Sequence, residues 1–216
     1  MENRLVTFLL QFDFNNAFDS ISLSKLLVKL KDIQVISKTS RSSVLGNNIG
    51  VPQGSVLCPF LFCLYINNLK IHLPDYAYHL LYAGDLQVYT QAPPEEITNA
   101  ITTLNLIANK VSNWADSVSL RLNHKKTIAI YFSTTGFIER VNALNLVVDV
   151  GEGIKIPFSE NVNSVAVLLD NKLSWNSQVK SIENKINRIL YSLRFLRHCT
   201  TEYLRIKLVR ALSSHI

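Results

Sequence analysis

The sequence predicts an α+β fold, in which a small antiparallel sheet is backed by helices and followed by a purely helical segment. Val6–Phe12 is short, apolar and rich in β-forming residues, which is typical of a buried strand. Tyr76–Thr90 predicts two short strands around the turn Ala83–Asp85, because glycine and aspartate favour hairpin tips. A long amphipathic helix is predicted to begin at Pro94.

The first half of the chain supplies a second and a third helix. Ser22–Lys31 carries leucines along one stripe, as an amphipathic helix does. Lys38–Asn48 is polar and predicts a hairpin or loop. Ser55–Leu69 predicts a helix that can start at Ser55 as its N-cap, and Pro59 is tolerated in its first turn.

The second half continues the alternation of helix and strand. Thr127–Phe132 predicts another strand, and Leu144–Val150 and Ser164–Leu169 are β-type segments. The apolar residues that define the helix after Pro94 recur at intervals of three and four: Ile97, Ile101, Leu104, Ala108, Val111 and Ala115.

The composition changes near Trp175. The segment after it predicts two helices, the first with apolar residues from Val179 to Leu193 and the second following Thr201. We therefore predict a mixed α/β part over residues 1–175 and a basic helical part over residues 176–216.

Composition suggests a large core or surfaces that once met other domains. The chain is 48% hydrophobic, and its charged fraction of 18% lies below the usual quarter. The net charge of +6 is concentrated in residues 171–216, where nine Lys/Arg stand against Glu183 and Glu202. A basic segment of this kind indicates a polyanionic partner, and the alternative is a solvated helix face.

The cysteines and the apolar runs bear on where in the cell the protein is expected. Cys58, Cys63 and Cys199 have no paired spacing, which indicates neither a zinc site nor a disulfide framework. The start of the chain has no signal-peptide pattern, and the longest apolar run, Val56–Ile66, is too short to span a bilayer. We expect an intracellular protein, in cytoplasm or nucleus, with no membrane partner.

Three segments carry the chemistry. They are Phe12–Asp19, Gly50–Ser55 and Tyr82–Asp85. Asp13 and Asp85 could together bind Mg²⁺, which prefers carboxylate and phosphate oxygens, if their strands are neighbours. The alternative is that the first aspartate simply ends a strand and the second is a turn residue.

In this order the segments resemble motifs A, B and C of the reverse transcriptase of non-LTR retrotransposons, of the LINE-like, jockey type. The resemblance implies a palm over residues 1–175 and a thumb remnant over residues 176–216. It implies RNA-directed DNA polymerase activity by two-metal nucleotidyl transfer, with Mg²⁺ as cofactor and an RNA template and DNA primer as partners. Asp13 and Asp85 would be the metal ligands.

The resemblance also assigns residues around the nucleotide. Phe18 would pack under the deoxyribose, with core packing as the alternative. Gln53 and Gly54 would contact the incoming nucleotide and the template. Leu122–Thr127 resembles motif D and places Lys126 near the nucleotide phosphates as charge partner or proton donor; the alternative is a solvated lysine at a strand edge.

Leu168–Trp175 resembles the segment that leads into the thumb in this family. The basic residues expected to contact nucleic acid follow it: Lys180, Lys185, Arg188, Arg194 and Arg197.

Departures from the family pattern predict an inactive copy. The family has two aspartates in motif C, whereas this chain has Gly84 before Asp85. Cys58 and Ala166 stand where the family has glycine, and His124 stands where it has proline. The spacing from motif A to motif B is short, and the fingers segment expected before motif A is missing. We expect a truncated, degenerate element.

Three functions therefore stay open. The chain is an RNA-directed DNA polymerase that still catalyses, a catalytically dead palm and thumb that still binds nucleic acid, or a translated remnant without selected function. Magnesium-dependent primer extension separates the first possibility from the others, and salt-dependent binding to primer–template separates the last two. The oligomeric state is left open.

Overall fold

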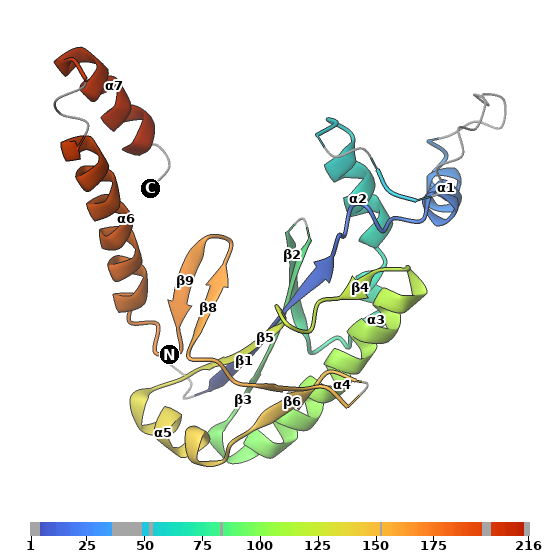
Figure 1. Ribbon diagram of the computed structural model, residues 1–216. Helices are drawn as coiled ribbons and strands as arrows, with labels where there is room; N and C mark the ends of the chain where they lie inside the picture. Colours follow the sequence, from blue (N-terminus) through green and yellow to red (C-terminus); the bar gives the residue numbers. More distant parts are fainter. Residues whose placement is uncertain are drawn as a thin grey trace. The chain divides into compact units, whose positions relative to one another are not determined.

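A computed structural model describes residues 5–35, 49–51, 54–82, 84–151, 153–195 and 200–213 (Figure 1). The chain forms two compact units, Met1–Ser159 and Glu160–Ile216. The expected loop Lys38–Asn48 lies outside the described residues. The two units meet between Ser159 and Glu160. The division into a palm up to Trp175 and a thumb after it stays a prediction.

A five-stranded antiparallel sheet forms the centre of the first unit. Its strand order is β2-β3-β1-β4, and β5 also pairs with β1. The strands are β1 (Val6–Asn15), β2 (Tyr78–Tyr82), β3 (Asp85–Ala92), β4 (Arg121–Leu122) and β5 (Ile128–Phe132). The predicted α+β fold with a small antiparallel sheet is confirmed.

Strand β1 is longer than its apolar stretch predicts. It continues past Asp13 to Asn15, because Phe14 and Asn15 pair with β4. Side chains alternate along a strand, so Phe8 and Phe12 lie on one face and are fully buried. Gln11 and Asp13 lie on the other face, which is only partly covered.

Helices cover the apolar face of the sheet (Figure 1). The long helix α4 (Ile97–Ser117), which follows the short 3₁₀ turn η1 (Pro94–Glu96), packs against β1, β3 and β4. Its buried stripe includes Leu104, Val111 and Trp114, and the indole of Trp114 meets Phe14 edge-on at 6.0 Å between ring centroids. The helix predicted after Pro94 is confirmed.

The predicted helix Ser55–Leu69 is divided in two. Helix α2 (Cys58–Ile66) is followed by the short α3 (Leu69–His72). Ser55 accepts a hydrogen bond from the Cys58 N–H at 3.2 Å, as a capping residue would, but regular helix begins only at Cys58. Asn68 lies at this break, and its amide oxygen accepts from Lys29 (3.0 Å) and from the Trp114 indole (3.2 Å).

Helix α1 (Leu23–Asp32) is tied to α2 and to the end of α4. The buried Tyr65 hydroxyl donates to the carbonyl of Val118 and accepts from the Ser22 N–H at 3.3 Å. Lys25 donates to the Ser117 carbonyl at 2.7 Å, at the C-terminal end of α4. These bonds fix the point from which the chain enters β4.

Two elements of the first unit have no sequence signal that predicts them. Helix α5 (Thr135–Ala143) contains Gly136 and lacks a long apolar period. Strand β7 (Lys155–Pro157) ends in proline and pairs with β6 (Val147–Asp149), which lies inside the predicted segment Leu144–Val150.

The second unit holds a hairpin and two helices. Strands β8 (Asn161–Ser164) and β9 (Val167–Asp170) form a hairpin, and both turn residues, Val165 and Ala166, have positive φ. The sequence predicts one uninterrupted β segment over Ser164–Leu169 instead. Helices α6 (Asn176–Phe195) and α7 (Glu202–Ser213) follow, as predicted. None of the residues described in α6 is buried, so this helix contributes surface rather than core.

Asp170 closes β9 and organises the turn before α6. Its carboxylate accepts from the backbone N–H groups of Lys172 and Ser174 and from the Ser174 hydroxyl, each at 3.0 Å. Burial opposes ionisation of this side chain, but the hydrogen bonds outweigh burial, and the pKa of Asp170 lies below its ordinary value.

Candidate active site

The β1–β3 register places Asp13 directly opposite Asp85. Asp13 lies two residues before the end of β1, and Asp85 is the first residue of β3, just after the hairpin turn. Directly opposed residues in an antiparallel pair have Cβ atoms about 4.5–5.5 Å apart and point to the same face. The predicted adjacency of the two carboxylates is therefore present in the fold.

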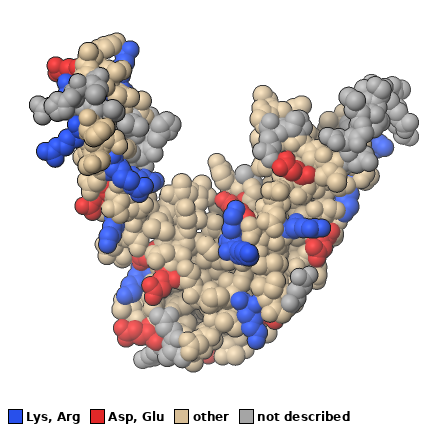
Figure 2. Space-filling model, viewed as in Figure 1, with Lys and Arg blue, Asp and Glu red and all other residues tan. Residues whose placement is uncertain are grey.

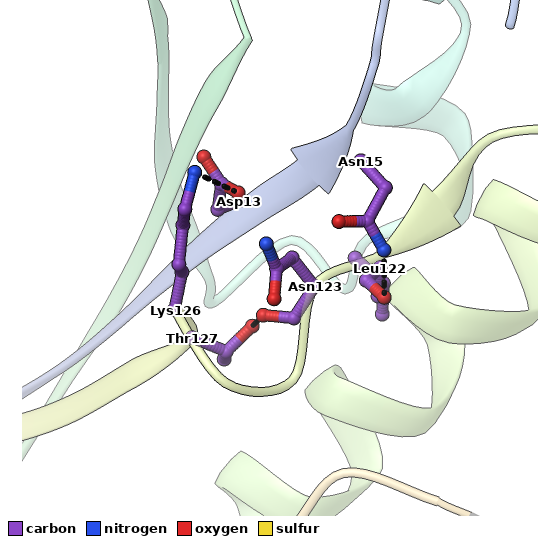
Figure 3. Close-up of polar contacts among 6 residues, drawn as sticks. All are labelled: Asp13, Asn15, Leu122, Asn123, Lys126 and Thr127. Atoms are coloured by element: carbon purple, nitrogen blue, oxygen red, sulfur yellow. Dashed lines mark hydrogen bonds and ion pairs between the residues drawn. The ribbon is translucent and has the colours of Figure 1, made fainter.

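A lysine lies beside Asp13 (Figure 3). The Lys126 Nζ is 3.5 Å from Oδ2 of Asp13. The lysine side chain is 69% exposed and that of Asp13 is 25% exposed, so the ion pair stands at the edge of the sheet surface rather than inside the core. The predicted association of Lys126 with nucleotide phosphates is untested.

The turn from Asn123 to Thr127 holds the lysine in place (Figure 3). The Asn123 N–H donates to the backbone carbonyl of Asp13 at 2.8 Å, which ties the turn to β1. The N–H groups of Lys126 and Thr127 then donate to the Asn123 carbonyl at 3.0 and 2.9 Å, and the Thr127 hydroxyl donates to the same oxygen. The backbone of the turn is thus anchored to the strand that carries the aspartate.

Electrostatics at the pair favour a cation. Burial raises the pKa of Asp85, the negative charge of Asp13 raises it further, and the positive charge of Lys126 lowers it. Two carboxylates in one place repel each other unless a positive charge lies between them. The lysine supplies part of this compensation.

Gly84 leaves room for a side chain. A Cβ built at this position would contact the Cβ of Ala17 at 3.7 Å, which is ordinary van der Waals distance, and Gly84 does not have a positive φ. The backbone therefore does not require glycine here. A Cβ fits at the position where the resemblance predicts an aspartate.

The donor set does not fit a two-ion centre. Within the described part of the chain, no group of three or more His, Cys, Asp or Glu side chains is arranged to hold a metal ion. Asp13 and Asp85 supply two carboxylates, and an ammonium group occupies their vicinity. Two-metal sites place ions about 3.5–4 Å apart and need enough carboxylate charge to hold both, which two aspartates beside a lysine do not supply.

The predicted nucleotide contacts are placed only in part. Phe18 is half-buried and packs on Phe62 with ring centroids 4.6 Å apart, which is the core-packing alternative. Gly54 has φ +87° and open space around it. Gln53 lies outside the described residues.

The motif B segment docks on the chain that follows motif A. The Gly50 N–H donates to the Ile21 carbonyl at 2.8 Å, and the Val51 N–H donates to the Phe18 carbonyl at 3.2 Å. Gly50 itself has φ +86°, and an added Cβ would crowd the backbone of Asp19 at 3.3 Å. Glycine is therefore required at this crossing.

The predicted nucleic-acid contacts belong to the second unit. Lys180, Lys185, Arg188 and Arg194 are all exposed on α6, and Figure 2 shows Lys and Arg side chains along this helix. The Arg188 Nε donates to the Asn184 carbonyl of the same helix at 3.4 Å. Arg197 lies outside the described residues.

Sequence reasoning missed a second polar pair on the same face. Gln11 and Gln87 face each other in the β1–β3 register, two residues from the aspartate pair, and Gln87 is buried. The signal was available, because Gln11 and Asp13 interrupt an otherwise apolar strand with a period of two. Asn123, which tethers the lysine turn, was named only as part of a motif.

An antiparallel sheet backed by helices, with opposed aspartates where strand β1 meets a hairpin, defines the palm type of nucleic-acid polymerase. The chain belongs to the reverse transcriptase family: the model of reverse transcriptase (RNA-dependent DNA polymerase) matches residues 1–183. The resemblance to reverse transcriptases of non-LTR retrotransposons is thereby confirmed.

Two relatives come from Drosophila melanogaster. The chain is 27% identical over 150 residues to the RNA-directed DNA polymerase from mobile element jockey, a match that covers 66% of this chain and 15% of that protein. It is 28% identical over 142 residues to the probable RNA-directed DNA polymerase from transposon X-element, covering 63% of this chain and 14% of that protein. The chain thus spans about a seventh of the length of these relatives.

Among solved structures, apo telomerase from Candida tropicalis, truncated from its C-terminal domain, aligns with a TM-score of 0.47 at 17% identity. The alignment covers 78% of this chain and 34% of that chain. No helix among the described residues is long and apolar enough to cross a membrane.

Proposed function

We propose that this chain is a reverse transcriptase palm that has lost nucleotidyl transfer and retains nucleic-acid binding through α6. The observation that carries the proposal is the register of Asp13 against Asp85, with Gly84 in the place of a third carboxylate. Reverse transcriptases generally use divalent metal ions. A site that lacks one carboxylate holds such ions weakly, and the transition state then lacks its main charge stabilisation.

Binding requires less than catalysis. Reverse transcriptases work on a nucleic-acid template and primer, and contact with a phosphate backbone needs clustered lysine and arginine rather than metal. The exposed basic residues of α6 supply this cluster. Because the partner is nucleic acid and the cysteines have no paired spacing, we place the protein inside the cell, in cytoplasm or nucleus.

Primer extension on an RNA template tests the catalytic half of the proposal. With Mg²⁺ or Mn²⁺ the chain is expected to yield no extended primer, and Asp13→Asn should give the same blank result. Robust metal-dependent extension that Asp13→Asn abolishes would contradict the proposal, because it would prove that two carboxylates suffice. The matched measurement of primer–template binding in the same samples separates a chain that binds without catalysis from a chain that does neither.

A further inference from the structure

The aspartate pair of the palm has a positive charge of its own. We propose that Lys126 is the resident cation of the Asp13–Asp85 pair and competes with divalent metal ions for it. The two carboxylates are too few for a centre of two metal ions. The positive charge of the lysine explains how they lie opposite each other without a metal ion between them. The inference concerns the charge of this pair and uses no property of nucleic-acid binding.

The charges around the pair nearly balance without a metal ion. Directly opposed like charges on neighbouring strands destabilise a sheet, and each strand here contributes one aspartate to the same face. The ammonium group 3.5 Å from Asp13 Oδ2 offsets one of the two negative charges. With Gly84 in place of a third acid, the remaining net charge is too small to attract two divalent ions strongly.

One carboxylate oxygen of Asp13 lacks a hydrogen-bond donor among the described residues. This oxygen, Oδ2, is buried as an atom. A buried carboxylate oxygen needs a donor or a cation, and the group that faces it is Lys126 Nζ. The lysine therefore occupies the position from which an incoming cation would approach this oxygen.

Backbone hydrogen bonds of the turn Asn123–Thr127 position Lys126. The turn is tied to Asp13 itself by the Asn123 N–H bond of 2.8 Å, and it is closed by two further N–H groups on the Asn123 carbonyl. Although the Lys126 side chain is largely exposed, its starting point is fixed relative to the aspartate. A metal ion that binds this carboxylate must therefore displace the ammonium group or share the oxygen with it.

The competition has a measurable consequence. Removing the ammonium charge should raise the affinity of the pair for a divalent ion, while removing a neighbouring charge should not. Lys125 is the matched control because it is the adjacent residue in the same turn, is exposed and carries the same charge. Lys126→Arg retains the positive charge and should retain the exclusion.

The experiment measures binding of Mn²⁺ alone, by the loss of the free-ion electron paramagnetic resonance signal, with no nucleic acid present. Lys126→Met is expected to bind Mn²⁺ roughly fivefold more tightly than the wild type, which is the scale of an exposed ion pair. Lys125→Met and Lys126→Arg should match the wild type, and Asp13→Asn in the Lys126→Met background should abolish the gain.

Equal affinity in the wild type and Lys126→Met would overturn the proposal, and so would an equal gain in Lys125→Met. Circular dichroism checks that each variant is folded, and Lys126→Gln repeats the test if the methionine variant aggregates. The proposed function is tested separately, by primer extension and by nucleic-acid binding through α6, so its failure is distinguishable from failure of this inference.

Discussion

Asp13 and Asp85 face each other across the β1–β3 pair, at the point where β3 leaves its tight turn with β2. The period of two puts both side chains on one face of the sheet, and the non-local pairing of β1 with β3 sets their register. The arrangement also creates a strained electrostatic situation, because two like charges share one patch of sheet. The consequences of that situation can be tested residue by residue.

Restoring a carboxylate at position 84 should convert the pair into a metal site. Gly84→Asp adds a third negative charge where a Cβ fits, and without metal it should lower the free energy of unfolding by on the order of 1 kcal/mol through repulsion. Added Mn²⁺ should then raise the unfolding midpoint of this variant more than that of the wild type, because an ion that binds only the folded state stabilises it.

Gly84→Ala is the control for backbone and packing effects. It places a Cβ at the same position without charge, and its contact with Ala17 at 3.7 Å should leave stability within about 0.5 kcal/mol of the wild type. A large loss in Gly84→Ala would mean that glycine is needed for the turn. In that case the missing aspartate could not be restored by one substitution.

The turn between β8 and β9 should be relieved by glycine. Val165 and Ala166 have φ of 47° and 67°, and only two residues join the strands, the arrangement in which Asn-Gly is preferred. Left-handed backbone costs a residue with a Cβ about 1–2 kcal/mol, part of which the greater chain entropy of unfolded glycine offsets. Ala166→Gly should therefore stabilise the protein by about 0.5–1 kcal/mol in urea unfolding.

The opposite substitution provides the check. Ala166→Val introduces a β-branched residue at positive φ and should destabilise the protein. If glycine and valine were both destabilising, the Ala166 methyl group would be acting through packing. The backbone explanation would then be wrong.

The turn at Ala166 illustrates what the sequence could not reveal. A Val-Ala pair has no turn signal, so Ser164–Leu169 was predicted as one segment, whereas the structure has a hairpin there. Helix α5 was missed for a related reason, since Gly136 weakens its local propensity and tertiary contacts of Ile138 and Val141 stabilise it.

The candidate site was more predictable, because its parts are local. The strand before Asp13 and the hairpin before Asp85 each have their own sequence pattern, and an antiparallel sheet then brings them together. The ion pair of Asp13 with Lys126 was not predicted. It depends on the pairing of β4 with Phe14 and Asn15, which joins residues more than a hundred positions apart and which no local pattern encodes.

Asp170 should make the stability of the protein depend on acidity. Its pKa is lowered in the folded state, so the folded protein binds its proton less readily than the unfolded chain. The stabilisation is therefore present above the unfolded pKa of about 4 and is lost as the pH falls through the lowered folded value. Asp170→Ala should cost about 1–3 kcal/mol near neutral pH, because it leaves the donors at Lys172 and Ser174 without their acceptor.

Asp170→Asn separates charge from hydrogen bonding. It keeps one carbonyl oxygen for the backbone donors and removes the titration, so its stability should be less dependent on pH than that of the wild type. The measurement is the urea midpoint of each protein from neutral pH down to about pH 3, near the unfolded pKa. A constant difference between wild type and Asp170→Asn across this range would contradict the assigned pKa shift.

Nucleic-acid binding should reside in α6 and should be electrostatic. Reversing Lys185, Arg188 and Arg194 to glutamate removes three exposed positive charges from one helix. Each phosphate contact contributes a slope of about −0.7 to −0.9 to the dependence of log K on log salt, so the triple variant should lose about two to three units of that slope. Fluorescence anisotropy with a labelled RNA–DNA primer–template, titrated at several salt concentrations, measures both affinity and slope.

The matched control reverses the same number of charges elsewhere. Lys110, Lys125 and Lys155 are exposed residues of the first unit, and their joint reversal to glutamate changes the net charge by the same amount. If α6 is the contact surface, this control should weaken binding far less and keep the salt slope, and Asp13→Ala should leave both nearly unchanged. If the two triple variants weaken binding equally, the effect comes from net charge alone. The basic residues of α6 would then only keep an amphipathic helix soluble, and the assignment of a nucleic-acid-binding thumb would be wrong.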